Sequence, residues 1–370
     1  MSSGDKTTNG LSHKIEVPSS GGKKALECGS MLGMAHHNVL EHPVARETHR
    51  HTYSLYGVRI TSDRAFEFPS AVDTGSFLAD VEFVQTTAHF FDPSDKIEDE
   101  SAADGWFSQR RLPDGSTYLR CGRLYEFCVE ADGKRIVTRP LEGADPLALQ
   151  NFLFGQVLSF ALIAQGLEQL HATVLNVHDL AVGFLGDCRF GKSTLAAAFV
   201  QAGHRLVTDD MLMLDDRDGC LFAQPGSGRI KLQPDSAAAL LAHGRPSRPL
   251  IPGATKHCFS LQAHEVERTT LPLRHVYLLP PPIERESVAE IDIQQLSHAA
   301  GFRALLSNSF NVAVLERDRL ARQFAFAATV ATRVPVHVLR YPPGLSHVQK
   351  VRQAVTEHVM ESRLSLGGYP

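Results

Sequence analysis

Nine consecutive residues near the middle of the chain restrict its fold more than any other feature. The first eight match the pattern G-x-x-x-x-G-K-[ST], and a threonine follows. An apolar run, AVGFL at 181–185, precedes them, and a helix-favouring run, TLAAAFV at 194–200, follows or overlaps their end. Because the pattern requires a strand before it and a helix after it, this context predicts an α/β fold rather than a chance match in a surface turn. The nine residues are Gly186, Asp187, Cys188, Arg189, Phe190, Gly191, Lys192, Ser193 and Thr194.

The chemistry predicted for this loop is phosphate binding. Its glycines let backbone N–H groups converge on phosphate oxygens, and the start of the helix adds the positive end of its dipole. Lys192 is expected to reach the β- and γ-phosphates, and the Ser193 hydroxyl to ligate Mg²⁺, which prefers hard oxygen donors. The predicted cofactors are therefore ATP, or another nucleoside triphosphate, and Mg²⁺. Cys188 is either a thiol activated by the helix start or a small side chain at a variable loop position.

Two adjacent acids, Asp209 and Asp210, follow the predicted strand RLVT at 205–208. A single acid at a strand end is typical of a magnesium ligand. Neighbouring side chains of a strand point to opposite sides, so one acid can face Mg²⁺ while the other takes the proton of a hydroxyl group. The alternative is an acidic loop. That alternative suits Asp215 and Asp216 better, because they lie in the turn-like run DDRDG.

The composition and the hydrophobic pattern change along the chain, which predicts three parts. Residues 1–50 are rich in Ser, Gly, Lys and His without periodicity, which is typical of a flexible tail. Residues 51–145 hold short aromatic and β-branched runs broken by turns, which indicates a smaller β-rich domain of mainly antiparallel strands. Residues 146–370 alternate strands with helices and predict an α/β P-loop domain. The run NVAVL at 311–315 is among its expected strands.

Composition excludes several classes of protein. Lys and Arg total 37 and Asp and Glu total 41, so the net charge of −4 gives no basic excess for nucleic acid or an anionic membrane. The six cysteines include no C-x-x-C pair, which disfavours a zinc ribbon or a disulfide framework. The uncharged run at 146–167 is interrupted by Gln and Asn and is interpreted as a buried helix rather than a membrane span. A cytoplasmic protein is predicted, and a homo-oligomer is left open.

The arrangement resembles the catalytic domain of the HPr kinase/phosphorylase family. That family has a strand-borne His, the G-x-x-x-x-G-K-S loop and then G-H-R-L-V-x-D-D; here His171 stands 15 residues before the loop, and GHRLVTDD occupies 203–210. The motif resemblance covers about residues 168–215. It implies an α/β P-loop domain of HPr-kinase type that transfers a phosphoryl group from a nucleoside triphosphate to a hydroxyl. By this resemblance His171 and Asp209 act on the acceptor side, with Asp209 as the base, and Ser193 and Asp210 hold the metal.

A second resemblance concerns the acceptor. The E-I-R-G core with which the family recognises HPr is absent, and QPGSGRIKLQP occupies the corresponding region, 224–234. The N-terminal run TYSLYGVRITSD at 52–63 looks like the HPr-kinase-like enzymes of lasso peptide biosynthesis, which implies phosphorylation of the C-terminal Ser of a precursor peptide. A kinase of a small hydroxylated metabolite or of another protein is the enzymatic alternative. A nucleotide-dependent regulatory module is the non-enzymatic one.

Three later cations, Arg229, Lys231 and Lys256, are candidate contacts for a carboxylate or phosphate. Ordinary surface positions explain each of them equally well. Their sequence neighbourhood does not separate the two interpretations.

We expect Lys192→Ala to abolish phosphoryl transfer without unfolding the protein. Loss of an electrostatic contact to the transferred group typically costs several kcal/mol of barrier. Transfer from labelled ATP, with circular dichroism as the folding control, measures both effects. Near-normal turnover of a folded variant would contradict the assignment of a phosphate-binding loop.

Overall fold

The structure is a computed structural model that describes residues 50–67, 77–90, 107–241, 245–251, 253–311 and 314–365. All of these residues belong to one compact unit, Thr48–Pro370. Apart from Arg50, the predicted tail lies outside the described residues. The predicted domain boundaries at 51 and 146 stay predictions. The strands of the first sheet lie within residues 51–140, and those of the second sheet begin at Leu170.

The first sheet follows the order β1-β2-β3-β7-β6-β5-β4. Its pairs β2–β3 and β3–β7 are parallel and the other four are antiparallel, in line with a mainly antiparallel domain. Its strands are β1 (His51–Leu55), β2 (Val58–Ser62), β3 (Ala79–Gln85), β4 (Phe107–Arg111), β5 (Thr117–Cys121), β6 (Tyr125–Val129) and β7 (Arg135–Pro140).

A long apolar helical segment covers this sheet and consists of α1 (Pro146–Phe152), a π-helical turn (Leu153–Val157) and α2 (Leu158–Ala164). Asp145 caps its start by accepting a hydrogen bond from the Ala148 backbone at 3.0 Å. By length and mean hydropathy, 1.7, the segment could cross a membrane, but 72% of its most apolar window is buried inside the protein. It shares one hydrophobic core with the first sheet, as the sequence predicted for a buried helix.

The second sheet has nine strands, with the path β10-β8-β9-β17-β13-β12 and with β11, β18 and β19 joined to it. Strand β17 runs parallel to both β9 and β19. The strands are β8 (Leu170–Val177), β9 (Leu180–Leu185), β10 (Arg205–Thr208), β11 (Met211–Leu212), β12 (Leu214–Arg217), β13 (Cys220–Ala223), β17 (Leu271–Leu278), β18 (Asp292–Gln295) and β19 (Val336–Arg340).

The remaining elements are a small sheet in the order β14-β16-β15 and the helices around the second sheet. The small sheet comprises β14 (Arg229–Leu232), β15 (Ser247–Pro249) and β16 (His257–Ser260). The helices are α3 (Lys192–Gln201), α4 (Pro234–Leu240), α5 (Pro282–Arg285), α6 (His298–Ser307), α7 (Arg317–Arg333) and α8 (Val348–Ser365), with 3-10 turns at Ala263–Glu265 and Leu345–His347.

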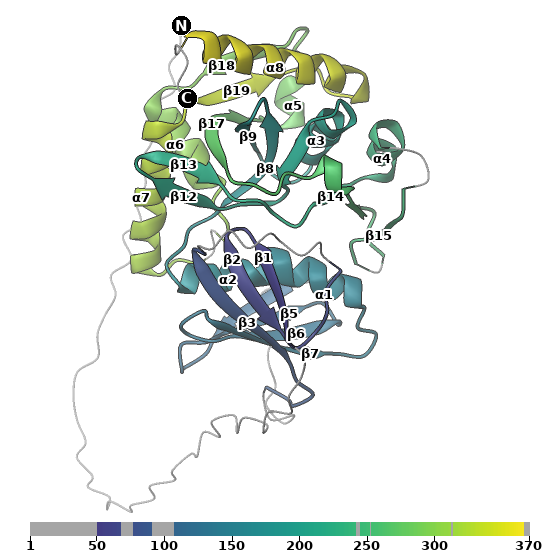
Figure 1. Ribbon diagram of the computed structural model, residues 1–370, viewed down its shortest axis with the longest axis vertical. Coiled ribbons are helices and arrows are strands. Elements are labelled where there is room, and N and C mark those ends of the chain that lie inside the picture. Colours follow the sequence, from purple (N-terminus) through teal and green to yellow (C-terminus); the bar gives the residue numbers. More distant parts are fainter. Residues whose placement is uncertain are drawn as a thin grey trace, which may run out of the picture. The chain divides into compact units, whose positions relative to one another are not determined.

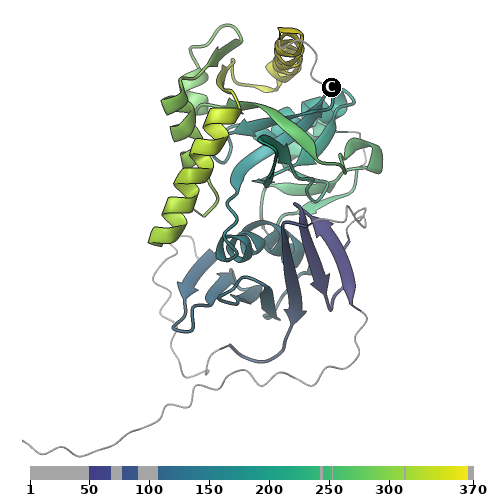
Figure 2. The same ribbon diagram turned by 60° about the vertical axis from the view of Figure 1, so that its left-hand side comes forward.

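Alternation along β9 assigns the two faces of the second sheet. Val182 and Phe184 pack in one core with residues of α3 and α8, whereas Ala181 and Leu185 pack in another with residues of α6 and α7. Helices α3 and α8 contact each other (Figure 1). Figure 2 shows α6 and the yellow-green α7 together, apart from the yellow α8. Both faces are therefore covered, as expected for a sheet with parallel strands at its centre.

The prediction of a mixed α/β protein is confirmed. The expected strand at 311–315 is wrong for the described residues, since 311, 314 and 315 lie in no strand and 312–313 lie outside the description. The expected turn at Asp215 and Asp216 is also wrong, because both residues belong to β12 and pair with β13. Hydrophobic and turn-like runs this short do not fix a conformation, and pairing with distant strands decides it.

A buried ion pair anchors α7 to the start of β8. Arg319 is 1% exposed and lies 3.3 Å from the Glu168 carboxylate, which is itself buried two residues before β8 begins. The same guanidinium donates a 2.6 Å hydrogen bond to the Phe310 carbonyl. Burial raises the pKa of Glu168, against the charges of Arg319 and Arg322.

Glu168→Gln should lower the free energy of unfolding by about 3–5 kcal/mol, because it leaves the Arg319 charge buried without its partner. Asp80→Asn breaks the exposed Arg59–Asp80 pair and should cost less than about 1 kcal/mol. Urea unfolding monitored by circular dichroism compares the two variants. Equal losses would contradict the anchoring role.

Candidate functional site

The glycine-rich loop leaves the end of β9 and enters α3 at Lys192. Gly186 and Gly191 have φ of +144° and +103°, in the region that favours glycine, and Arg189 adopts φ +68° despite its side chain. The Gly186 backbone N–H donates a 2.9 Å hydrogen bond to the Asn308 side chain. The loop is thus bent over the helix start, and protein groups engage three of its backbone amides: the Asn308 side chain that of Gly186, the Asp187 carboxylate that of Cys188 and the Asp187 carbonyl that of Phe190.

Lys192 folds back into the loop. Its Nζ donates hydrogen bonds to the Gly186 carbonyl at 2.6 Å and to the Asp187 carbonyl at 3.3 Å, and the residue is only 6% exposed. Burial lowers the pKa of this ammonium. The charge is held within the bend of the loop, where phosphate oxygens can replace the two carbonyls. Because the stem is buried, Lys192→Met is the matched companion of Lys192→Ala: it removes the charge and keeps the packing.

Asp209 is buried and fully engaged. Its carboxylate accepts a 2.6 Å hydrogen bond from the Thr173 hydroxyl of β8, bonds of 3.3 Å from the Ser193 hydroxyl and one of 3.2 Å from the Lys231 backbone N–H. Burial raises the pKa of Asp209, and the neighbouring charge of Asp210 raises it further. The carboxylate is therefore the group that faces the loop's serine.

Asp210 points elsewhere and pairs with the Lys231 ammonium. Its φ of +73° interrupts the extended chain between β10 and β11, so the two adjacent acids do not simply alternate across a strand. Burial raises the pKa of Asp210, but the charge and hydrogen bond of Lys231 outweigh burial and bring it to about 2. Asp210 is thus ionised at neutral pH.

His171 lies on the same face of β8 as Thr173, two residues away. The centroids of the His171 and Phe310 rings lie 5.7 Å apart, in an edge-to-face arrangement. The His171 backbone N–H donates a 2.6 Å hydrogen bond to the Asn308 carbonyl. Burial, followed by the charge of Lys192, lowers its pKa to about 4, while the Asp210 charge acts in the opposite direction. His171 is therefore a neutral imidazole within electrostatic reach of Asp210.

Two cavities adjoin these groups. A larger one, about 740 Å³, lies beyond the carboxyl ends of β9, β17 and β19 and is lined by His171, Gly186, Asp187 and the arginines Arg303 and Arg340, among others. Its volume lies within the range of small-molecule sites, and carboxyl ends of parallel strands are where α/β sheets bind ligands. A second cavity of only about 20 Å³ lies between the acid pair, Tyr56 of the β-rich region and Gln150 of α1.

The structure brings five of the predicted site residues together: His171, Lys192, Ser193, Asp209 and Asp210. The side chains of the other loop residues are not part of this group. Asp187, Cys188 and Arg189 are exposed, Phe190 is half-buried, and the Thr194 hydroxyl lies 3.3 Å from that of Ser236. The roles assigned to the individual residues stay predictions.

Sequence reasoning missed two groups that the site depends on and left the role of a third, Lys231, open. Thr173 and Asn308 carried no motif. Lys231 could not be separated from a surface cation, although its position on β14 beside the acids gives it a specific partner. Arg229 is not a surface cation: it is 7% exposed and donates a 2.8 Å hydrogen bond to the Gln150 side chain.

Comparison with known proteins gives a local similarity in sequence. No family model matches the chain. Over 56 residues it is 36% identical to an HPr kinase/phosphorylase of Clostridium beijerinckii. The chain is similar there to that enzyme. The match covers 15% of this chain and 18% of the relative, less than a fifth of the relative's length. The structure of the Hpr(Ser) kinase/phosphatase from Coxiella burnetii aligns with 54% of this chain and 99% of its own at 15% identity, with a TM-score of 0.31 that is too low to establish a shared fold.

Lys231→Met should raise the pKa of Asp210 above about 2, because the ammonium supplies the charge and the hydrogen bond that lower it, whereas burial, which raises it, remains. Lys231→Arg keeps the charge and should keep the pKa low. Carboxyl ¹³C NMR of labelled aspartate across pH, with Asp210→Asn to assign the signal, measures the titration. An unchanged titration in Lys231→Met would contradict the ion pair.

Proposed function

We propose that this protein is a nucleoside triphosphate-dependent kinase that phosphorylates a hydroxyl group. One observation carries the proposal: the Ser193 hydroxyl of the loop lies 3.3 Å from the Asp209 carboxylate, while a second acid, Asp210, is held separately beside Lys231. The local similarity to an HPr kinase/phosphorylase supports the same class of reaction. Nucleotide binding alone requires only the first acid, so the second acid favours an enzyme over a regulatory module.

The contacts favour an exchange of the roles that the sequence suggested for the two acids. Ser193 and Asp209 supply adjacent oxygen donors at the phosphate end of the loop, which suits Mg²⁺ and its preference for hard oxygen ligands. Bound Mg²⁺ would neutralise charge on the β- and γ-phosphate oxygens. Asp210, which makes no hydrogen bond to Ser193 among those the structure describes, is left to face the acceptor.

The chain's own groups divide the remaining work. The loop amides and Lys192 hold the triphosphate and stabilise negative charge on the transferred group. Asp210 orients the acceptor hydroxyl and takes its proton as the new O–P bond forms and the bond from the γ-phosphorus to the β–γ bridging oxygen breaks, which releases the nucleoside diphosphate. A strong base is not required, because the transition state of phosphoryl transfer is loose and positioning dominates. This agrees with an Asp210 pKa of about 2. Neutral His171 lines the larger cavity and lies within electrostatic reach of Asp210.

The small cavity beside the acid pair bears on the acceptor. Its volume of about 20 Å³ holds a group about the size of one water molecule. A hydroxymethyl group can enter while the rest of its molecule stays outside, which suits a Ser or Thr side chain of a peptide. We therefore take the C-terminal Ser of a lasso precursor peptide, in the cytoplasm, as the proposed acceptor. A small metabolite or another protein remains the alternative.

The acceptor is tested with the full chain, labelled ATP, Mg²⁺ and a precursor peptide ending in Ser. The same peptide ending in Ala is the control. Label should enter only the Ser peptide and should appear as a phosphate ester. Label in both peptides would reject the C-terminal Ser, and no label in any hydroxyl acceptor would reject the kinase.

Asp210→Asn should bind Mg-nucleotide with near-normal affinity and lose about 10²–10⁴ in rate, because it loses the carboxylate that orients the acceptor hydroxyl and accepts its proton. Asp209→Asn should instead move the Mg²⁺ titration to higher concentration. Nucleotide affinity with and without Mg²⁺, together with phosphopeptide formation, separates the two effects. Asp218→Asn, in the exposed turn after β12, is the matched control and should change neither.

Exchanged phenotypes would restore the roles suggested by the sequence, with Asp209 as the base. If neither Asp209→Asn nor Asp210→Asn alters transfer, the acid pair has no part in the reaction and the mechanism is wrong.

A further inference from the structure

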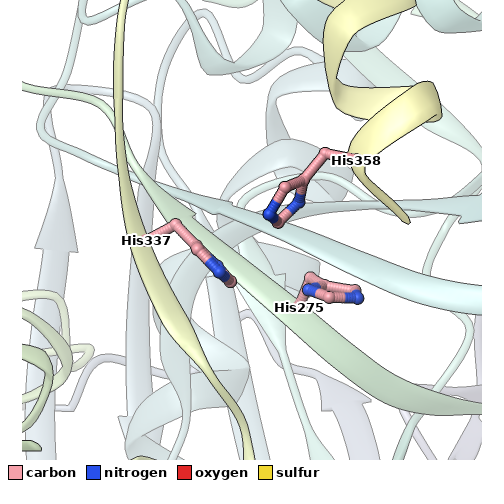
Figure 3. Close-up of side chains that lie close together, drawn as sticks. All are labelled: His275, His337 and His358. Carbon is pink, nitrogen blue, oxygen red and sulfur yellow. The ribbon is translucent and has the colours of Figure 1, made fainter. Parts of the chain in front are cut away.

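Three histidines from distant parts of the sequence converge beneath α8. They are His275 of β17, His337 of β19 and His358 of α8, and one ring nitrogen from each lies within 4.8 Å of the others. Figure 3 shows the three rings directed towards one another from two strands and the helix. The proposed kinase reaction uses none of them.

The register of the sheet explains why they meet. His275 and Tyr277 are two residues apart on β17 and share a face, and His337 of β19 pairs directly with Tyr277. Helix α8 covers this face and buries Val355 and Val359 on it. His358 therefore faces the two strands, and its Nδ1 lies 2.7 Å from the Tyr277 hydroxyl in a hydrogen bond.

The three imidazoles are neutral at physiological pH. Burial, followed by the neighbouring histidines, lowers the pKa of His275 to about 3 and that of His337 to about 4. Burial also lowers the pKa of His358. The nearby ions act in opposite directions, since Arg274 lowers the pKa of His275 and Glu361 raises that of His358. Because the three rings are neutral, each has one ring nitrogen with a free lone pair that can bind a metal ion.

Packing alone leaves polar atoms of the cluster without partners. The rings contact one another, with centroids 4.7 Å apart for His337 and His358, but the Nδ1 atoms of His275 and His337 are buried without a hydrogen-bond partner. The two residues are 6% and 4% exposed. A buried, unsatisfied nitrogen costs about 1–3 kcal/mol. An interaction that uses ring nitrogens would offset this cost, and aromatic packing does not provide one.

We propose that His275, His337 and His358 bind a divalent metal ion of the zinc class, which joins α8 to the central strands. Neutral imidazole is the ligand that Zn²⁺, Ni²⁺ and Cu²⁺ prefer, at about 2.0–2.1 Å for zinc. The nitrogens, which lie within 4.8 Å of one another, must come closer together to meet this geometry when the metal binds. The Tyr277 hydroxyl holds Nδ1 of His358 and leaves Nε2 for the metal, as outer partners of metal-binding histidines commonly do.

This site is distinct from the proposed magnesium position. Mg²⁺ takes oxygen ligands and disfavours an all-imidazole set, so the two metals would not exchange places. Strand β17 connects the two regions, since Leu279, just after the strand, donates a 2.9 Å hydrogen bond to the Leu185 carbonyl at the start of the phosphate loop. Metal bound at the histidines would therefore stabilise strand β17, which adjoins the phosphate loop, without contacting the triphosphate.

The test compares Zn²⁺ binding by the metal-stripped full chain, by His358→Gln and by His264→Gln, using competition with a chromophoric chelator. His264 is exposed on the turn Ala263–Glu265, so His264→Gln is the matched control. The histidines of residues 1–50 are present in all three proteins, and any binding by them cancels. At Zn²⁺ concentrations that fill the site in the natural chain, His358→Gln should bind one Zn²⁺ fewer per chain. Its affinity at this site should fall by at least about 100-fold, because loss of a residue that only hydrogen-bonds to a ligand costs about 10–100-fold.

Zn²⁺ should also raise the melting temperature of the natural chain and of His264→Gln, and not that of His358→Gln. Co²⁺ substitution in the natural chain provides a measurement independent of any variant: the intense visible bands of a four-coordinate site are expected. Zinc uptake by His358→Gln equal to that of the natural chain, or a Co²⁺ spectrum of the weak, six-coordinate aquo type, would overturn the proposal.

Discussion

The buried carboxylate of Asp209 is the interaction around which the rest of the site is arranged. Its hydrogen-bond donors come from three elements: Thr173 from β8, Ser193 from α3 and the Lys231 backbone from β14. An unpaired carboxylate in this position would cost several kcal/mol, so the three elements are held together by the need to satisfy it. The same contacts fix the loop's serine, the strand that carries His171 and the strand that carries Lys231.

The N-terminal region completes this arrangement and does not stand apart from it. The Tyr56 backbone N–H donates a 2.7 Å hydrogen bond to the Pro225 carbonyl, and Gln150 of α1 accepts one from Arg229 of β14. The π-helical turn after α1 contributes Phe154 and Gly155 to the small cavity at the acid pair. Such turns occur often at functional sites, because they shift a helix face by one residue. Tyr56 of the β-rich region and the helical segment that covers its sheet thus line the small cavity beside the acid pair.

The parts of the site that could be predicted from the sequence are those encoded by neighbouring residues. The phosphate loop is local: its glycines, lysine and serine follow one another, and the strand and helix around it are adjacent. The acid pair was found for the same reason. The roles of its two members stay predictions, but their different surroundings do not follow from alternation along a strand, because Asp210 has a positive φ between β10 and β11 and its carboxylate pairs with Lys231. Lys231, Thr173 and Asn308 act through contacts that span many residues, and no periodicity in one chain shows such contacts.

The histidine cluster could not be predicted from the sequence for the same reason: its members are brought together only by the fold. His275, His337 and His358 stand 62 and 21 residues apart, and each is an ordinary residue of its own strand or helix. Only the parallel pairing of β17 with β19, and the covering of that face by α8, turns them into one group. The sheet thereby carries two clusters of different chemistry: carboxylate and hydroxyl oxygens at the loop, and imidazole nitrogens beneath α8. Because hard and borderline cations select between such donor sets, a single sheet can hold both kinds of ion without competition between them.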